Sequence, residues 1–305
     1  MLKKTQCLSS ETHKARRTEQ IEAIRELRHK YPLMALLKFA GIPKATYYYY
    51  IQKNRQEDKY KKLKEQIQSI FYENKSRYGY RRITLELRNR GIIANHKLVL
   101  KLMNELELCC KVRRKKYKSY KGEVGKSAPN ILKRDFKAEK PKEKWTTDVS
   151  EFSISSGKLY LSPILDMFNG EIISYNVSKS PNFQQTISML DKALSSFKDL
   201  KGLILHSDQG WQYRQAEYQH RLSECGIIQS MSRKGNCLDN AIMENFFGIM
   251  KSEMFYGYEK TFKTLEELEL AIREYIEYYN NRRIKLRLKG MSPVKYREHF
   301  EKSIT

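Results

Sequence analysis

The chain has 305 residues, and its 59 Lys or Arg against 35 Asp or Glu give a formal net charge of +24 and a pI of about 9.7. This length allows two or three domains. So basic a chain predicts a polyanionic partner, by default nucleic acid; the alternative is a highly soluble protein whose lysines are simply solvated. The sequence lacks the roughly 18-residue apolar run that spans a membrane and the apolar segment of a signal peptide. Its cysteines lack the paired spacing of zinc ribbons or of secreted disulfide frameworks. It therefore predicts a soluble, cytoplasmic protein with no membrane partner.

Residues 1–60 are predicted to be a helical region that contains a helix-turn-helix. The segment LMALLKFAGIPKATYYYY predicts a short apolar helix that ends at Gly41, a turn, and a second helix that begins near Lys44. The start of the second helix is the part that reads DNA in such motifs, so Lys44, Thr46 and Tyr47 are candidate DNA contacts. Any small helical hairpin gives the same pattern.

Residues 61–110 are predicted to form a compact three-helix DNA-binding unit. Gly91 ends the middle helix and Asn95 caps the third. Arg81 and Arg82 open the middle helix, where they either contact DNA phosphates or are simply solvated. Apolar side chains recur at helical spacing in all three segments. These positions are Ile67, Ile70, Phe71, Ile83, Leu85, Leu87, Leu98, Leu102 and Leu106.

Residues 111–144 are predicted to be a basic linker. They contain 14 basic and 4 acidic side chains and few apolar ones, too few for a core. We expect this segment to be extended, mobile and attracted to phosphates; the alternative is a linker that only aids solubility.

Residues 145–260 show the order of strands and helices of a ribonuclease-H-like catalytic core. Three strands form an antiparallel meander and are followed by helix, strand, helix, strand and helix. The expected strands are 145–154, 158–168, 170–177, 202–208 and 227–231, and the expected helices are 182–197, 215–226 and 238–255. This order predicts an α/β fold with a mixed five-stranded sheet flanked by helices.

Three acidic residues of this core are predicted to converge. Asp148 lies in the first strand and Asp208 at the carboxyl end of the fourth, which are neighbours in this topology, while Glu244 lies on the last helix. Converging carboxylates repel one another unless a divalent cation joins them. The expected occupants are two Mg²⁺ ions, for which Mn²⁺ can substitute, about 4 Å apart as in enzymes that break and join phosphodiesters.

Several side chains near these acids are candidate DNA contacts. Helical spacing places Asn240 and Lys251 on the face of Glu244; Asn240 is expected to hydrogen-bond the metal site and Lys251 to hold a DNA phosphate. Trp211 and Tyr213 either stack on a flipped base or cover the edge of the sheet.

Asp166, Asp239 and Glu253 are rival acids of the same region. Asp239 is expected in the first turn of the helix, where the helix dipole favours it, and the other two are expected to be solvated or in ion pairs. His206 is expected to be a histidine at a strand end with a hydrogen-bond partner rather than a general base.

Residues 261–305 are predicted to be C-terminal helices. The first of them begins at a capping box made by Thr264 and Glu267. Arg282 and Arg283 follow that helix, at the start of a basic cluster that is expected to contact DNA.

The motifs WTTDVSEF, HSDQGWQY and SRKGNCLDNAIMENFFGIMKSE, followed by YIEYYNNRRIKLRLKGMSPVKY, closely resemble the integrase-like catalytic core of bacterial insertion-sequence transposases. The resemblance is to the second-reading-frame product of the family numbered three, and it covers residues 145–300. It extends less specifically to LLKFAGIPKATYYYY and RYGYRRITLELRNRG. Asp208 and Glu244 are separated by 35 residues, the spacing that this family shares with retroviral integrases, and Lys251 matches its basic residue on the helix.

The resemblance implies a DNA transposase in which Asp148, Asp208 and Glu244 hold Mg²⁺. Such an enzyme cleaves at the ends of its element to free a 3′-hydroxyl and joins it to another phosphodiester. The implied partners are double-stranded DNA at the element ends and the target, and an upstream-frame product with a helix-turn-helix and a leucine zipper. Because two ends must be brought together, a homo-oligomer is expected on DNA, in the nucleoid of a bacterial cytoplasm.

Two departures from the resemblance and two alternatives stay open. The His/Cys zinc domain of retroviral integrases has no counterpart in the spacing of the six histidines and five cysteines, and no sustained heptad precedes Leu33. One alternative is a catalytically idle DNA-binding regulator or inhibitor of transposition, although a pure binder has no physical need for converging carboxylates. The other is a general nuclease of the same fold, which lacks strand joining.

Overall fold

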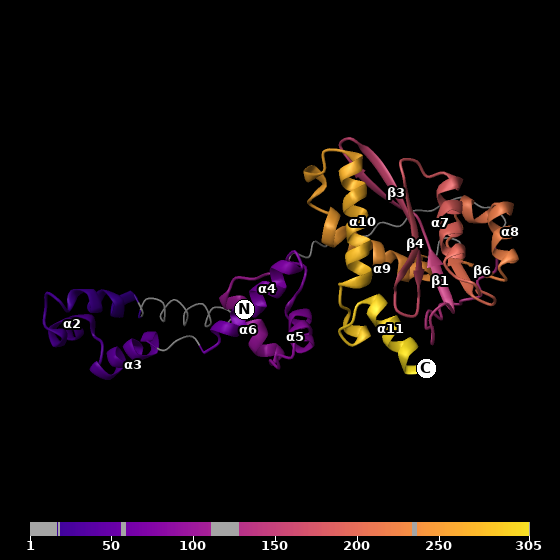
Figure 1. Ribbon diagram of the computed structural model, residues 1–305. Helices are drawn as coiled ribbons and strands as arrows, with labels where there is room; N and C mark the ends of the chain where they lie inside the picture. Colours follow the sequence, from indigo (N-terminus) through magenta and orange to yellow (C-terminus); the bar gives the residue numbers. More distant parts are fainter. Residues whose placement is uncertain (1–16, 18, 56–58, 111–127, 234–236, 305) are drawn as a thin grey trace. The chain divides into compact units, whose positions relative to one another are not determined.

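The computed structural model describes residues 17, 19–55, 59–110, 128–233 and 237–304 (Figure 1). The chain divides into two units, residues 1–66 and 67–305, and each is described by itself. No helix among the described residues is both long enough and apolar enough to cross a membrane.

The first unit contains the predicted pair of helices and the turn between them. Helix α2 (Leu33–Ala40) ends at Gly41, whose φ of +63° is a left-handed conformation that glycine adopts without strain, and α3 (Lys44–Arg55) follows. A helix over residues 19–27 completes the unit. Its core consists of Ile21, Ile24, Leu37, Ile42 and Tyr47.

Three helices form the next part of the chain, as predicted. They are α4 (Lys61–Glu73), α5 (Tyr80–Asn89) and α6 (His96–Glu105). The buried positions on α4 and α5 are predicted ones, but α6 buries Val99, Leu102 and Met103, so the expected stripe through Leu98 and Leu106 is wrong by about one helix position. Asn95 caps α6, since its side chain accepts a hydrogen bond from the amide of Lys97 at 2.9 Å.

The second unit is built on a mixed sheet. Its strands are β1 (Lys144–Thr147), β2 (Ser150–Ile154), β3 (Gly157–Asp166), β4 (Ile172–Ser178), β5 (Ile204–Ser207) and β6 (Ile228–Met231). β1 and β2 pair antiparallel with β3 in one register, since Thr147 faces Ile164 and Ser150 faces Leu161. They are therefore two halves of the predicted first strand.

The remaining pairings give the ribonuclease-H-like order that the sequence predicts. β4 is antiparallel to β3, β5 is parallel to β1, and β6 is parallel to β5. With β1 and β2 taken as one strand, the described residues form a five-stranded sheet. Its antiparallel half comes from hairpins and its parallel half from connections through helices.

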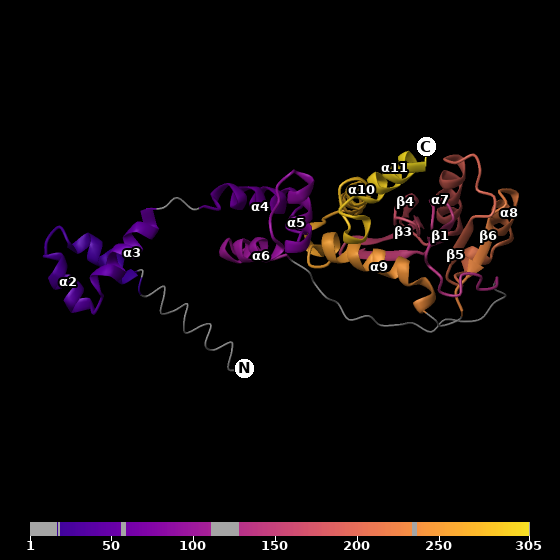
Figure 2. The same ribbon diagram turned by 90° about the horizontal axis from the view of Figure 1, so that it is seen from below.

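Helices cover both faces of the sheet. Thr146 of β1 bonds to Asn240 beside α9, whereas the next residue, Thr147, bonds to Met189 of α7, because successive strand residues point to opposite faces. α7 and α8 lie on one side and α9 and α10 on the other (Figures 1 and 2). The helices are α7 (Phe183–Ser195), α8 (Ala216–Glu224), α9 (Ala241–Met250), α10 (Leu265–Asn281) and α11 (Pro293–Ile304). The predicted capping box begins α10.

Short turns extend two of these elements near the carboxyl edge of the sheet. The 3₁₀ turn η1 (Trp211–Arg214) follows β5, and the 3₁₀ turn η2 (Cys237–Asn240) leads into α9. α9 continues into η3 (Lys251–Phe255), one turn of π-helix. The predicted helix over 238–255 is thus present as three joined pieces.

The predicted mobile linker is wrong for its second half. Residues 111–127 lie outside the described residues, but 128–143 contact the core. The amides of Ile131 and Leu132 donate to the hydroxyl of Ser230 at 3.0 and 3.4 Å, and Leu132 is buried. A few apolar side chains within a basic stretch are enough to hold it there.

Asp239 ties this segment to the start of α9. Its carboxylate is 1% exposed and accepts hydrogen bonds from the amide and guanidinium of Arg233 at 3.0 Å, from Arg134 at 2.9 Å and from Asn130 at 3.0 Å. The bonds from Arg233 hold the pKa of Asp239 well below its ordinary value. Asp239 does lie in the first turn, as predicted, but ion pairs and not the dipole alone keep it charged.

Asp239→Ala is expected to lower the free energy of unfolding by about 2 kcal/mol, because it removes the charged hydrogen bonds by which one buried carboxylate joins Asn130, Arg134 and Arg233. Urea unfolding at pH 7 measures this loss. Because the pKa of Asp239 is lowered in the folded state, its stabilisation is present above pH 4 and is lost as the pH falls further. Asp191→Ala, which removes an exposed partner of Arg221, is the control and is expected to cost less than about 1 kcal/mol. Equal losses from the two variants would contradict the role of Asp239.

Candidate active site

The strand register brings Asp148 and Asp208 together at one edge of the sheet. β1 and β5 are parallel, and Thr146 pairs with His206. Asp148 and Asp208 each lie two residues beyond this pair, toward the carboxyl ends of the two strands. The ladder between the first strand and β3 is interrupted at Asp148, whose Oδ1 accepts a hydrogen bond from the amide of Val149 at 2.7 Å. The prediction that these two strands are neighbours in the sheet is confirmed.

Glu244 approaches the same edge from α9. It lies in the first turn of that helix, whose start is held to β1 by a 2.9 Å hydrogen bond from the Thr146 hydroxyl to Asn240 Oδ1. The charge of Glu244 reaches Asp148, whose pKa it helps to raise. No three His, Cys, Asp or Glu side chains in the described residues are close enough together to hold a metal ion as they stand.

Burial and like charge dominate the electrostatics of the two aspartates. Burial, then the charge of Asp208, raise the pKa of Asp148 to about 8. Burial also raises the pKa of Asp208, against the opposing effects of the Gly210 amide and the charge of Arg214. Two such carboxylates either keep a proton at neutral pH or require a cation, and their oxygens are the ligands that hard divalent cations prefer. The donor set therefore fits Mg²⁺ or Mn²⁺.

Gly210 is a site residue that sequence reasoning missed. Its amide donates to Asp208 Oδ1 at 2.9 Å, and a Cβ atom at this position would lie 2.9 Å from the same oxygen and 2.6 Å from Gln212 Nε2. Any side chain here would displace the carboxylate. The signal was present as a glycine two residues after an aspartate that ends a buried strand.

Lys251 lies close to the carboxylates, and its Nζ is 4.9 Å from the centre of the Phe152 ring. Its positive charge opposes the rise in the pKa of Asp148 and, after the hydrogen bond from Lys158, helps to lower the pKa of Glu151. Asn240, by contrast, is buried and uses its side-chain oxygen to hold α9 on β1. The predicted contact of Asn240 with DNA is therefore wrong, while Lys251 stays a candidate.

The rival acids and the histidine have structural roles. Glu253 is in an ion pair, as predicted. Asp166 was expected to be solvated or paired but is buried, with its carboxylate accepting from Trp145 Nε1 at 3.1 Å and from two backbone amides. His206 is bonded to the hydroxyls of Ser230 at 2.9 Å and Ser232 at 3.1 Å, and burial lowers its pKa to about 4, which confirms a neutral structural histidine.

One predicted DNA contact in the helix-turn-helix is wrong because its side chain is buried, and burial also excludes one of the two alternatives predicted for Tyr213 near the active site. Tyr47 is 0% exposed in the core of the first unit, while Lys44 is exposed and Thr46 is half-buried. Tyr213 is likewise 0% exposed, so it cannot stack on a base, whereas Trp211 is 49% exposed. Aromatic residue type alone did not distinguish a core position from a surface one.

The predicted arginine contacts divide in the same way. Arg81 and Arg282 are exposed. Arg283 is 2% exposed and is held by Glu253 at 2.6 Å, so its predicted contact with DNA is wrong. Arg82 is half-buried and lies 3.5 Å from the same carboxylate, which gives it an internal partner in place of a phosphate.

The sequence matches three known domain families. The HTH-like domain matches residues 57–116, and two Integrase core domain families match residues 138–237 and 244–300. The HTH-like match thus falls on α4, α5 and α6 and not on α2 and α3.

Named relatives cover most of the chain. It is 52% identical over 277 residues to the putative transposase InsK for insertion sequence element IS150 of Escherichia coli K12, covering 91% of this chain and 97% of that protein. It is 55% identical over 215 residues to an uncharacterized transposase-like protein of Haemophilus influenzae, covering 70% and 98%. It is 30% identical over 278 residues to transposase InsF for insertion sequence IS3A of Escherichia coli K12, covering 89% and 94%.

Asp148→Asn is expected to stabilise the protein in a chelating buffer, and more at pH 8 than at pH 5. The pKa of Asp148 is about 8 in the folded state, against about 4 in an unfolded chain, so stability falls as the pH rises through this window. Asparagine cannot ionise and removes this loss. Thermal unfolding at the two pH values measures the difference. A melting temperature that the substitution lowers at pH 8, or a difference that does not depend on pH, would contradict the raised pKa.

Proposed function

We propose that this chain, which belongs to the IS3 family of insertion-sequence transposases, cleaves and joins DNA strands with the carboxylates of Asp148, Asp208 and Glu244. The chain is a DNA transposase with an integrase core, an enzyme of the polynucleotidyl transferase class. The observation that carries the assignment of the residues is the β1–β5 register, which sets Asp148 beside Asp208 at the carboxyl edge of the sheet.

The three carboxylates would hold Mg²⁺ or Mn²⁺, since enzymes of this class generally use divalent metals. When bound, the metal supplies a Lewis acid that activates the attacking oxygen and stabilises the leaving one. The Val149 amide donates to Asp148 Oδ1, so Oδ2 would be the oxygen that carries a proton in the absence of a cation. Gly210 keeps Asp208 Oδ1 in place through its amide.

Lys251 would bind a phosphate of the DNA strand next to the carboxylates. Its position on the helix that carries Glu244, and its influence on the pKa of Asp148, support this role. Hydrolysis at the element end would free a 3′-hydroxyl, which then attacks a phosphodiester of the target strand. The bond to the new strand forms as the old phosphodiester bond breaks, and its oxygen leaves with a proton.

Double-stranded DNA at the element ends and in the target is the proposed substrate. The net charge of +24 suits such a polyanion. An upstream-frame product and a second copy of this chain are the proposed protein partners, because two ends must be held at once. A catalytically idle regulator is not favoured, since the relatives are transposases and the chain matches the integrase core.

Asp208→Asn and Glu244→Gln are expected to abolish joined element ends while DNA affinity is kept or rises. Removing one carboxylate removes a metal ligand but also a negative charge that repels DNA. Cells carry the gene in its native flanking DNA, with any upstream frame retained, and junctions are amplified and sequenced. Asp191→Asn, an exposed acid on α7, is the matched control and should give junctions as wild type does. Junctions from Asp208→Asn, in cells shown to make the protein, would refute the assignment.

A further inference from the structure

The contact between the three-helix unit and the catalytic core centres on Glu253. This residue lies in η3, the π-helical turn that continues α9, two residues after Lys251 and nine after Glu244. π-helical turns occur often at functional sites. Whatever holds Glu253 therefore also holds the end of the helix that carries the proposed catalytic carboxylate.

Glu253 gathers side chains from several elements. Its carboxylate accepts hydrogen bonds from Arg283 at 2.6 Å, from the Tyr275 hydroxyl at 3.0 Å and from Arg82 at 3.5 Å. Arg77 Nε donates to its backbone carbonyl at 3.2 Å. Burial alone would raise the pKa of Glu253, but Arg283 and Arg82 lower it below its ordinary value, so the carboxylate is ionised. Arg77 and Arg82 come from the three-helix unit, and the other two come from α10 and the segment after it.

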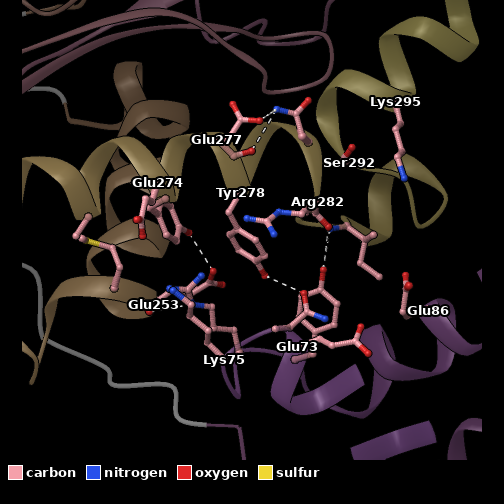
Figure 3. A pocket seen from close by; sticks show the side chains of 18 of the residues that line it. Glu73, Lys75, Glu86, Glu253, Glu274, Glu277, Tyr278, Arg282, Ser292 and Lys295 are labelled. Carbon is pink, nitrogen blue, oxygen red and sulfur yellow. Dashed lines mark hydrogen bonds between the residues drawn. The ribbon is translucent and has the colours of Figure 1, made fainter. Parts of the chain in front are cut away.

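Tyr78 completes the contact. It is 1% exposed, and its hydroxyl accepts from the amide of Ile284 at 3.1 Å and donates to the carbonyl of Arg282 at 3.2 Å. The guanidinium of Arg77 lies 4.8 Å from the centre of the Tyr278 ring. Figure 3 shows Glu253, Tyr278 and Arg282 on the side of α10, facing Glu73 and Glu86 of the three-helix unit.

A cavity of about 1270 Å³ lies beside these contacts and has Glu253, Arg77, Tyr78 and Tyr278 in its wall (Figure 3). None of the three proposed catalytic carboxylates lines it. The contacts between the two parts described above are polar and aromatic, and the cavity lies directly beside them. We call this set of contacts, made by Arg77, Tyr78 and Arg82 with Glu253 and residues 275–284, the joint. Loss of one such contact is expected to loosen the joint without unfolding either part.

Arg81 and Arg82 point in different directions from the start of α5. Successive helix residues are about 100° apart around the axis, and here Arg81 is exposed whereas Arg82 faces Glu253. Adjacent arginines of one helix thus have separate surroundings, one open to solvent and one directed at the catalytic core.

We propose that Arg82 and Glu253 are positioning residues that fix the three-helix unit to the catalytic helix and so determine which phosphodiester reaches the carboxylates. This inference rests on the proposed function. DNA held by the exposed face of the unit, including Arg81, is presented to Asp148, Asp208 and Glu244 at a set distance along the strand. Loosening the joint widens the range of phosphodiesters that reach the carboxylates, whereas weakening the affinity for DNA does not.

Arg82→Gln is expected to spread the cut over neighbouring positions and to slow cleavage at the main position by about tenfold or more, since small misplacements have large effects on rate. Its DNA affinity should stay within about twofold of wild type. Cleavage is mapped to the nucleotide on a duplex that carries the element end identified from the junctions. Arg82→Lys, which keeps the charge, is expected to recover most of the single position. A general loss of stability would reduce the yield of product but would not spread the cuts.

Arg81→Gln is the matched control, with the same change in the adjacent residue. It should keep the single cut position while DNA affinity falls and the slope of log affinity against log salt decreases by about 1. If Arg82→Gln cuts at the wild-type position and rate, or if it loses affinity and salt dependence as Arg81→Gln does, the joint is refuted.

Hydrogen exchange tests the joint without any catalysis. The amide of Ile284, which donates to Tyr78, should exchange faster in Arg82→Gln and at the wild-type rate in Arg81→Gln. Equal exchange in both variants would overturn the inference even if wild type cut no DNA. A wild-type protein that makes no cut, with faster exchange in Arg82→Gln, would instead count against the proposed function alone.

Discussion

Repulsion between two partly buried carboxylates is the constraint on which the rest of this structure depends. Asp148 and Asp208 are set side by side by the parallel pairing of β1 and β5, in a place where burial already disfavours their charge. Such a pair lowers stability unless something else holds the edge of the sheet in place. The hydrogen bonds of Gly210, the serines around His206 and the ion pairs of Asp239 all lie in this region and provide that support.

The same constraint explains how charge is distributed around the site. Lys251 partly offsets the negative charge at Asp148, and Arg214 does so at Asp208. Arg233 and Arg283 form ion pairs with Asp239 and Glu253, two acids that lie outside the site. The positive charge near the carboxylates suits a phosphate.

The sequence predicted the sheet and the neighbouring positions of Asp148 and Asp208 because both follow from rules of order and spacing. The alternation of elements determines which strands are neighbours, and that alone brings Asp148 to Asp208. Which side of an element is buried depends on packing partners far along the chain, so Tyr47, Arg283 and Asn240 were assigned to DNA wrongly. Composition failed for 128–143, since one buried apolar side chain, Leu132, and backbone hydrogen bonds to Ser230 hold this segment on the core in spite of its lysines.

Titration of Mg²⁺ into the protein by calorimetry, in two buffers of different ionisation enthalpy at pH 7, tests the central claim most directly. If Asp148 holds a proton that the cation displaces, binding releases a proton, the affinity rises with pH up to about 8, and Asp208→Asn abolishes binding. Binding that releases no proton, or that survives in Asp208→Asn, would contradict the account that these carboxylates form the metal site.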